Sequence, residues 1–366
     1  MWLSCLAAIL LALTFNSEIQ ATQQKIPPPA GEISGKDRGI DPLKNYWGDL
    51  DGFFDRQAQA SLDLLDEILV KYPPGSPERS ERKLALLMID TILHDPKAPE
   101  RSAVQEFFRQ RIQKATAKLE ETNLEAGAMI WKLYNHSFVV RTRSITLGFD
   151  LVRAHSAGKE RFVIEDEVMK RIVNQCDILF VSHVHPDHAD SFVARAFLDQ
   201  GKTVVAPDGV WAAEQFYSKI MHLDRDPNRI HEVSVKKGQA ILKVVLYPGH
   251  QGQNILNNVA LISTPEGLSF AQTGDQSNPE DFKWIDEVGR HHRVDILMPN
   301  CWTTDIARVI RGFKPAVVIT GHENELGHTV DHREPFWLSY DRLQKSTAPA
   351  LLMAWGEAYH YKPTPR

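Results

Sequence analysis

The sequence predicts an α/β fold, with a core of two β-sheets flanked by helices and a helical region before it. Three observations support this prediction. From about Ala128, short β-rich runs alternate with segments of helical periodicity, and the alternation occurs twice. Between residues 51 and 127, apolar residues instead recur every three or four positions. Potential metal ligands also follow several predicted strands directly.

Composition places the chain among ordinary soluble globular proteins. It has 366 residues, of which 43% are hydrophobic and 24% charged, enough for one large core or two domains. The formal net charge is −5, and the Lys and Arg residues are scattered along the chain. This distribution argues against nucleic acid as a partner. It does not predict an oligomeric state.

The first 21 residues read as a secretory signal peptide. Their apolar run, residues 6–15, is too short to span a bilayer and precedes the small residue Ala21. No Lys or Arg occurs before Lys25, so an uncleaved anchor helix is the alternative. We expect an exported chain, periplasmic or secreted, with no stable transmembrane span once the signal is removed. Cys176 and Cys301 would then remain, either as a disulfide or as two buried thiols.

Residues 22–50 are rich in Gly, Pro and charge, and predict an extended arm or linker. Residues 51–127 predict a helical extension of three amphipathic helices. Ser76 before Pro77 and Ser102 with Gln105 suit helix starts, the second as a capping box. The apolar stripes that define the helices are Leu62, Leu65, Ile68 and Leu69, then Leu84, Leu87, Met88 and Ile92, then Val104, Phe107, Phe108, Ile112, Ala115 and Leu119.

Residues 128–366 predict one domain that opens with an antiparallel meander. The meander strands are expected at 129–133, 138–141, 145–149 and 162–164. The first alternation then predicts helices at 166–174, from 190 and at 210–220, and strands at 177–181 and 203–206. The second predicts strands at 241–246, 259–263, 268–271, 294–298 and 316–319, and helices at 279–288 and 305–313.

The segment SHVHPDHAD, residues 182–190, carries the strongest chemical signal. It follows a short apolar strand, and Pro186 prevents that strand from continuing through the histidines. In an extended segment, alternate side chains share a face, so His183 and His185 can bind one ion. Asp187 and His188, beyond the Pro turn, can point elsewhere. The spacing therefore predicts two neighbouring metal ions.

Three further candidate ligands each follow a predicted strand and a Gly, namely His250, Asp275 and His322. The whole set of nitrogen and oxygen donors favours Zn²⁺, with Mn²⁺ or Fe as alternatives. His328 and His332 compete with His322, which we favour because it lies closer to a strand end.

Other polar residues of the chain could have several roles, and the sequence does not select one. Asp190 and Ser191 fit helix caps better than ligands. His136 and Asp150 fit two readings equally, as supports of ligand orientation or as a satisfied buried pair. The candidates for substrate contact are Gln251, Gln253, Asn300, Glu323 and Glu325.

The motif H-x-H-x-D-H, met by His183, His185, Asp187 and His188, resembles that of the metallo-β-lactamase superfamily. The resemblance runs from about Ala128 to the C-terminus and implies an αββα metallo-β-lactamase sandwich. Residues 130–138 and 148–150 resemble the ascorbate-6-phosphate lactonase-like and N-acylphosphatidylethanolamine phospholipase D-like branches. Those branches usually have Gly where Asn135 stands.

The resemblance also implies a division of the ligands. His183, His185 and His250 would hold one divalent ion, and Asp187, His188 and His322 the second, with Asp275 as the bridge. It implies hydrolysis by a hydroxide bound between two metals, with Asp187 and Asp275 as catalytic residues that position the nucleophile.

The expected function is therefore a metal-dependent hydrolase that cleaves an ester, lactone, amide or phosphodiester bond in a small molecule or lipid. A phospholipase D-like phosphodiesterase and a non-catalytic metal-binding or scaffold protein are the alternatives. The sequence leaves open the substrate, the native metal, the leaving-group acid and the role of the helical extension.

Overall fold

The computed structural model describes residues 48–153, 163–235 and 239–363. The predicted signal peptide, 1–21, and all of the predicted linker before residue 48 lie outside the described residues. Asp51–Arg366 forms one compact unit.

Three helices form the predicted helical extension. They are α2 (Leu50–Lys71), α3 (Ser80–Leu93) and α4 (Ser102–Glu121). The start predicted at Ser76–Pro77 is wrong, whereas α4 does begin at the predicted residue, Ser102. Helix α3 begins after Ser76–Pro77, and the N-cap of α4 is Arg101. Ser102 does not form a capping box because its hydroxyl donates to Asp55 Oδ2 of α2 at 2.6 Å.

Six strands form the first sheet, in the order β13-β1-β2-β3-β4-β5. The predicted antiparallel meander is present as β1 to β3, but Val163 and Ile164 form no strand. The helices of this half are α5 (Asp166–Gln175) and α6 (Ser191–Asp199). The strands are β1 (Ala128–Lys132), β2 (Phe138–Arg141), β3 (Thr146–Phe149), β4 (Ile178–Phe180), β5 (Thr203–Val205) and β13 (Glu357–Tyr361).

Seven strands form the second sheet, in the order β12-β11-β10-β9-β8-β7-β6. They are β6 (His231–Val235), β7 (Ala240–Gln251), β8 (Ile255–Ser263), β9 (Ser269–Gln272), β10 (Ile296–Met298), β11 (Val317–Ile319) and β12 (Ala350–Leu351). The helices of this half are α7 (Phe282–Ile285), α8 (Val288–His291), α9 (Ile306–Phe313) and α10 (Phe336–Leu343).

One predicted helix is absent, and another is divided into shorter pieces. Residues 210–220 contain only the short 3₁₀ helix η2 (Tyr217–Lys219). Trp211, with φ of 61°, lies in the left-handed region and interrupts helical geometry. The predicted helix 279–288 is instead broken into the 3₁₀ helix η3 (Pro279–Asp281), α7 and α8.

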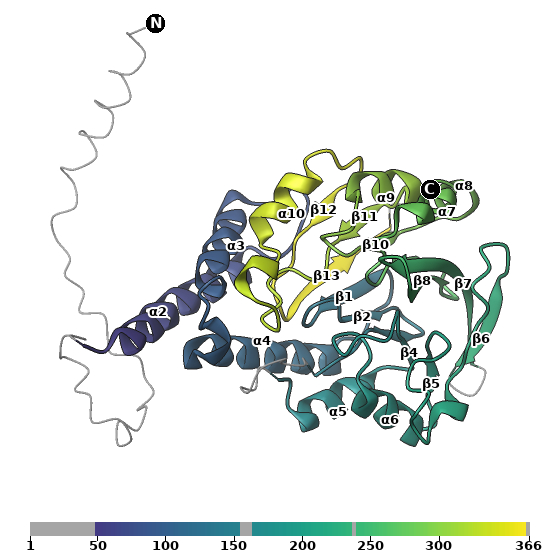
Figure 1. Ribbon diagram of the computed structural model, residues 1–366, viewed down its shortest axis with the longest axis horizontal. Helices are drawn as coiled ribbons and strands as arrows, with labels where there is room; N and C mark the ends of the chain where they lie inside the picture. Colours follow the sequence, from purple (N-terminus) through teal and green to yellow (C-terminus); the bar gives the residue numbers. More distant parts are fainter. Residues whose placement is uncertain (1–47, 154–162, 236–238, 364–366) are drawn as a thin grey trace, which may run out of the picture. The chain divides into compact units, whose positions relative to one another are not determined.

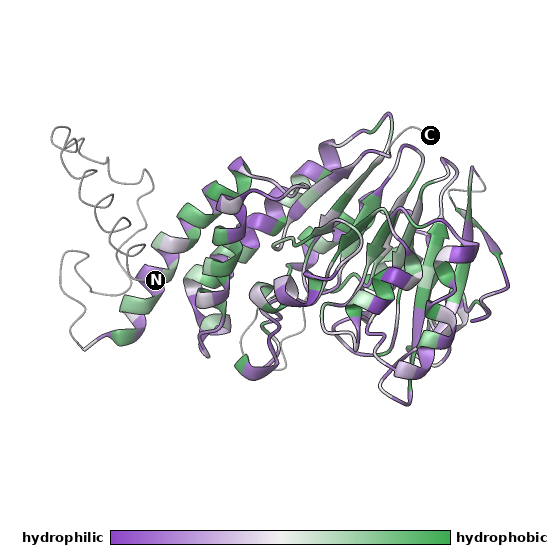
Figure 2. Cartoon of the chain, turned by 90° about the horizontal axis from the view of Figure 1, so that it is seen from above, coloured by the Kyte–Doolittle hydropathy of each residue, from purple (hydrophilic) through white to green (hydrophobic). Residues whose placement is uncertain are grey.

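The two sheets face each other across an apolar core, and helices cover their outer faces (Figure 1). Alternate strand residues divide between the layers. Ile130 and Val244 pack between the sheets, whereas Trp131 and Val245 pack on the helical side. Figure 2 shows the strands as largely hydrophobic and the helices as mixed in hydropathy. The predicted αββα sandwich is confirmed.

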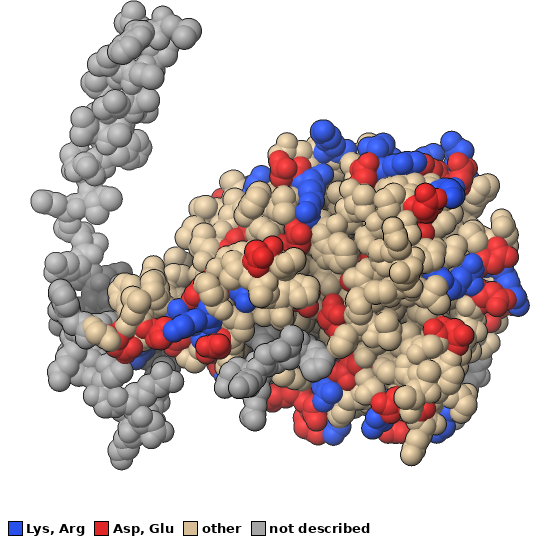
Figure 3. Space-filling model, in the orientation of Figure 1, with Lys and Arg blue, Asp and Glu red and all other residues tan. Residues whose placement is uncertain are grey.

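Within the described residues, no helix is long and apolar enough to cross a membrane. Cys176 and Cys301 are both buried and free, which leaves the reading as two buried thiols. Burial raises the pKa of the Cys176 thiol to about 12. On the face drawn in Figure 3, acidic and basic side chains are interspersed.

Candidate metal centre

The candidate ligands gather at one edge of the sandwich. Asp150 follows β3, the histidine motif follows β4, Asp275 follows β9 and His322 follows β11. Because β3 is parallel to β4, and β9, β10 and β11 are mutually parallel, their carboxyl ends meet at a shared edge of each sheet. Asp190 then ends the motif by capping α6, since its side chain accepts from Phe192 N at 2.9 Å.

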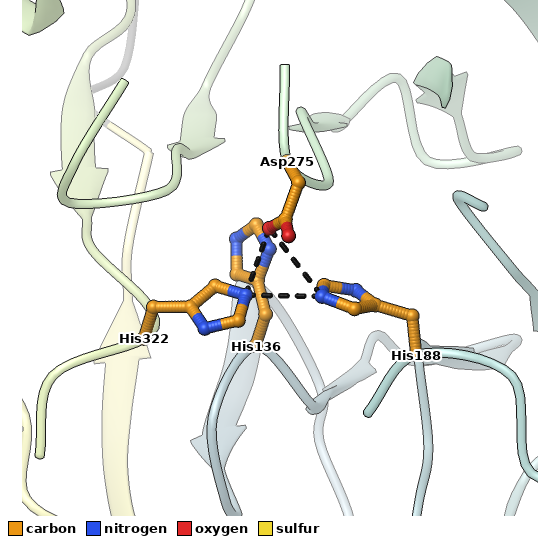
Figure 4. A group of neighbouring side chains, drawn as sticks. All are labelled: His136, His188, Asp275 and His322. Carbon is orange, nitrogen blue, oxygen red and sulfur yellow. Dashed lines mark hydrogen bonds and ion pairs between the residues drawn. The ribbon is translucent and has the colours of Figure 1, made fainter. Parts of the chain in front are cut away.

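Asp275 is shared by two groups of ligands. Its Oδ2 lies 3.6 Å from His183 Nε2, and that nitrogen lies 3.1 Å from His185 Nδ1. Its Oδ1 lies 2.8 Å from His322 Nε2 and 3.3 Å from His188 Nε2. Figure 4 shows the carboxylate of Asp275 pointing between the rings of His188 and His322. One carboxylate therefore faces two sets of imidazoles with different oxygens.

Two buried carboxylates fix the orientation of these rings. Asp150 Oδ2 lies 2.8 Å from His188 Nδ1, and Glu325 Oε2 lies 3.1 Å from His322 Nδ1. Since ionised carboxylates only accept hydrogen bonds, each Nδ1 carries a proton, and Nε2 is the nitrogen whose lone pair faces the site when the ring is neutral. The two Nε2 atoms are 3.0 Å apart. Two lone pairs at that separation repel each other unless a cation lies at the site.

The electrostatics of the site also favour positive charge. Burial opposes the protonation of His322, but Asp275 and then Glu325 raise its pKa to about 10. Burial also acts on Asp275, yet His322 and His188 hold its pKa well below the usual value. His183 behaves differently, because burial and the neighbouring His188 lower its pKa to about 3. It is thus a neutral ring, the form that binds a metal ion.

Asp150 also fastens the start of the motif. It accepts hydrogen bonds from Ser182 N and Ser182 Oγ, both at 2.7 Å. The Asp150 carboxylate therefore supports the orientation of His188, rather than forming a buried pair with His136 alone. His136 instead contacts Met298 O through Nε2, at 3.2 Å.

Three groups of described residues have ligand atoms within 4.8 Å of one another. They are His136, His188, Asp275 and His322; His183, His185 and Asp275; and Asp187, His322 and Glu325. The structure thus brings together six of the seven predicted ligands, namely His183, His185, Asp187, His188, Asp275 and His322. These nitrogen and oxygen donors fit zinc, manganese or iron.

His250, the seventh predicted ligand, belongs to none of these groups. Strand β7 continues through it, and its Nδ1 lies 2.9 Å from Asp281 Oδ1. The neighbouring Gln251 instead reaches the cluster, donating to Asp275 Oδ2 at 3.0 Å. The Asp281 contact uses Nδ1, so Nε2 is the ring nitrogen of His250 that it leaves unused.

Two residues enter the groups that the sequence did not predict as ligands, namely Glu325 and His136. Both had been singled out for other roles, and their proximity arises from loop conformation, which spacing does not encode. The competing His328 is about half exposed and lies 3.5 Å from Glu325 Oε2 through its Nδ1. The other competitor, His332, has an exposed side chain beside Asp331.

No family model and no curated protein matches the chain. Among solved structures, a metallo hydrolase of the hyperthermophilic archaeon Ignicoccus hospitalis matches with 13% identity and a TM-score of 0.50. That match covers 65% of this chain and 100% of the archaeal one.

Two further structures match with lower TM-scores. An isothiocyanate hydrolase from Delia radicum gut bacteria has 13% identity and a TM-score of 0.46, covering 64% of this chain and 99% of that one. A metallo-β-lactamase from Pontibacter korlensis has 15% identity and a TM-score of 0.33, covering 49% and 88%. The first match shows a shared fold, which agrees with the two-sheet topology and the motif.

Proposed function

We propose that this chain, which has the metallo-β-lactamase fold, is a metal-dependent hydrolase with two divalent transition-metal ions, Zn²⁺ being favoured. The observation that carries the proposal is the carboxylate of Asp275, whose two oxygens face separate imidazole groups. His183 and His185 would hold one ion, with His250 as its proposed third ligand. Asp187, His188 and His322 would hold the other, and Asp275 would touch both.

When bound, such ions polarise a carbonyl or phosphoryl oxygen and lower the pKa of water toward neutrality. The protein's own groups provide orientation. Asp150 and Glu325 keep the Nε2 lone pairs of His188 and His322 directed into the site. Asp187 lies 3.1 Å from His188 Nε2, and its side chain is 21% exposed. It is therefore placed to orient the attacking water.

The ligand set argues against a purely structural metal site. A structural zinc uses four protein ligands and leaves no open position. This centre offers more donors than that, and Asp187 and His250 are partly open to solvent. A substrate can therefore reach the donors from the solvent side. We propose as substrate an ester, lactone, amide or phosphodiester of a small molecule or lipid, with a phospholipase D-like reaction as the alternative.

The test combines metal analysis with a screen of chromogenic esters, phosphodiesters, lactones and amides. The metal-replete protein should contain two ions per chain. Asp275→Ala removes the carboxylate between two dications, so their repulsion should rise and activity should fall by about a hundredfold or more. Circular dichroism should show an intact fold. A fully active Asp275→Ala protein, or one ion per chain under replete conditions, would rule out the bridged mechanism.

A further inference from the structure

The segment that carries His322 has a backbone conformation that its own sequence does not favour. His322 has φ of 77° and Asn324 φ of 56°, both in the left-handed region. A non-glycine residue persists there only when surrounding contacts hold it. We call residues 322–337 the His322 segment. Its contacts identify what holds it.

Asp90 of α3 makes the first attachment. This carboxylate is only 5% exposed. Its Oδ1 accepts from Asn324 Nδ2 and from Phe336 N, each at 2.9 Å, and its Oδ2 accepts from Trp337 N at 3.0 Å. Phe336 and Trp337 are the first residues of α10, whose own N-cap, Pro335, offers no side-chain hydrogen bond. Asp90 thus caps α10 and fixes Asn324 at once.

Arg333 makes the second attachment from within the His322 segment. Its side chain is buried, and Nη1 donates to Leu93 O at 2.8 Å and Asp95 O at 3.1 Å, at the C-terminal end of α3. Its Nε donates to His328 O at 2.8 Å, inside the segment. Both ends of the segment are therefore fastened to the same helix, which Figure 1 shows beside α10.

We propose that α3 is part of the metal centre's construction, because Asp90 and Arg333 hold His322 in the backbone conformation that presents Nε2 to the site. Asp90 acts as a positioning residue, through Asn324 and α10, and touches no substrate. The helical extension then has a function beyond covering the sandwich. This inference rests on the proposed function in one respect, that His322 is a metal ligand.

The test is Asp90→Asn in the full chain. An amide has one acceptor oxygen, so it cannot satisfy the donors that both carboxylate oxygens now serve. In the metal-free protein, amide hydrogen exchange over residues 322–337 should accelerate about tenfold. In a Zn²⁺ titration against a competing chelator dye, one of the two binding steps should lose about tenfold in affinity, the same step that His322→Ala weakens, while the other step stays unchanged.

Asp66→Asn is the matched control. Asp66 belongs to α2 and binds Lys114 at 2.8 Å and also Arg111, whose Nε donates to Trp355 O. The Asp66→Asn variant thus removes a carboxylate from a different contact of the helical extension. That contact involves no residue of the His322 segment. This variant should leave both the exchange of residues 322–337 and the two affinities as in the unsubstituted protein.

Three outcomes would overturn the proposal: unchanged exchange in Asp90→Asn, unchanged Zn²⁺ affinity in that variant, or equal effects of Asp66→Asn. If Asp90→Asn fails to fold, Arg333→Lys takes its place. The guanidinium binds Leu93 O and Asp95 O through Nη1 and His328 O through Nε, whereas a lysine has a single nitrogen and cannot make both attachments. Failure of the proposed function is distinguishable. An unsubstituted protein that takes up no Zn²⁺ would refute the metal centre, while the exchange data would still decide whether α3 holds the segment.

Discussion

Single buried carboxylates determine how the imidazoles of the candidate centre are directed. Asp150 binds His188 and Ser182, and Glu325 binds His322. The metal-binding residue types could be predicted from the sequence, because three histidines within six residues after a strand rarely serve any purpose other than metal binding. It did not reveal Glu325 or Asp281 as partners of the rings. Those contacts depend on loop conformation. Loops have no repeating pattern of apolar residues from which their conformation could be predicted.

His322 and His328 should respond differently to substitution. The Nε2 of His322 lies 2.8 Å from Asp275, whereas His328 is about half exposed. His322→Ala should lower kcat/KM by about a hundredfold or more and weaken one Zn²⁺ step. His328→Ala should stay within a few-fold of the unsubstituted protein, as measured on the substrate that the screen yields. Equal losses in the two variants would show that His328 shares the ligand role.

At the scale of elements, strands with clear apolar runs were predicted well, and irregular elements were not. The strand predicted to end at Leu246 continues as β7 to Gln251, because β8 pairs with it to the end. Its last residues include Pro248 and Gly249, which usually end a strand, so the sequence alone predicts too early an end. Strand β13 and helix α10 were missed because both have short, weak patterns that pairing and packing stabilise.

Gly321, the residue before His322, is required for space and not for a left-handed backbone conformation. It is His322, not Gly321, that has the positive φ. A Cβ at residue 321 would lie 2.2 Å from His136 Cδ2. Gly321 therefore makes room for the buried ring of His136.

Gly321→Ala should consequently be destabilising. The ring of His136 is fully buried and has little space to move, so we expect a loss of about 1–3 kcal/mol in the free energy of unfolding. The measurement is urea denaturation followed by circular dichroism. Gly75→Ala is the control, because its nearest neighbour would be Pro73 O at 3.9 Å. Equal midpoints for the two variants would contradict the steric argument.

At the scale of the whole molecule, buried charges join the helical extension to the sandwich. Arg82 of α3 donates to both oxygens of Glu357 in β13, at 2.7 and 2.6 Å, and to Leu352 O at 2.6 Å. The two side chains are almost wholly buried. They are 275 residues apart in the sequence, so periodicity and spacing offered no means of pairing them.

Removing one partner of this pair should be costly. Arg82→Met would leave Glu357 buried near only the more distant Arg111, and we expect a loss of about 3–5 kcal/mol in unfolding free energy. Chemical denaturation would measure it. Arg79→Met, three residues away with an exposed side chain, should have little effect. A small loss of unfolding free energy in Arg82→Met would contradict this expectation. It would mean that the ion pair is no more favourable than the hydration of the two side chains in the unfolded chain.

The packing of α4 has a practical consequence for shortened versions of the protein. Phe108 of α4 lies edge-on to Tyr134 and Trp355, each with ring centroids 5.5 Å away, over the outer face of the first sheet. A chain begun at residue 128 would keep every ligand of the motif but lose Phe108, and so expose Tyr134 and Trp355 to water. Such a fragment should aggregate on expression, although it contains the whole sandwich. The useful boundary for truncation therefore lies before α2.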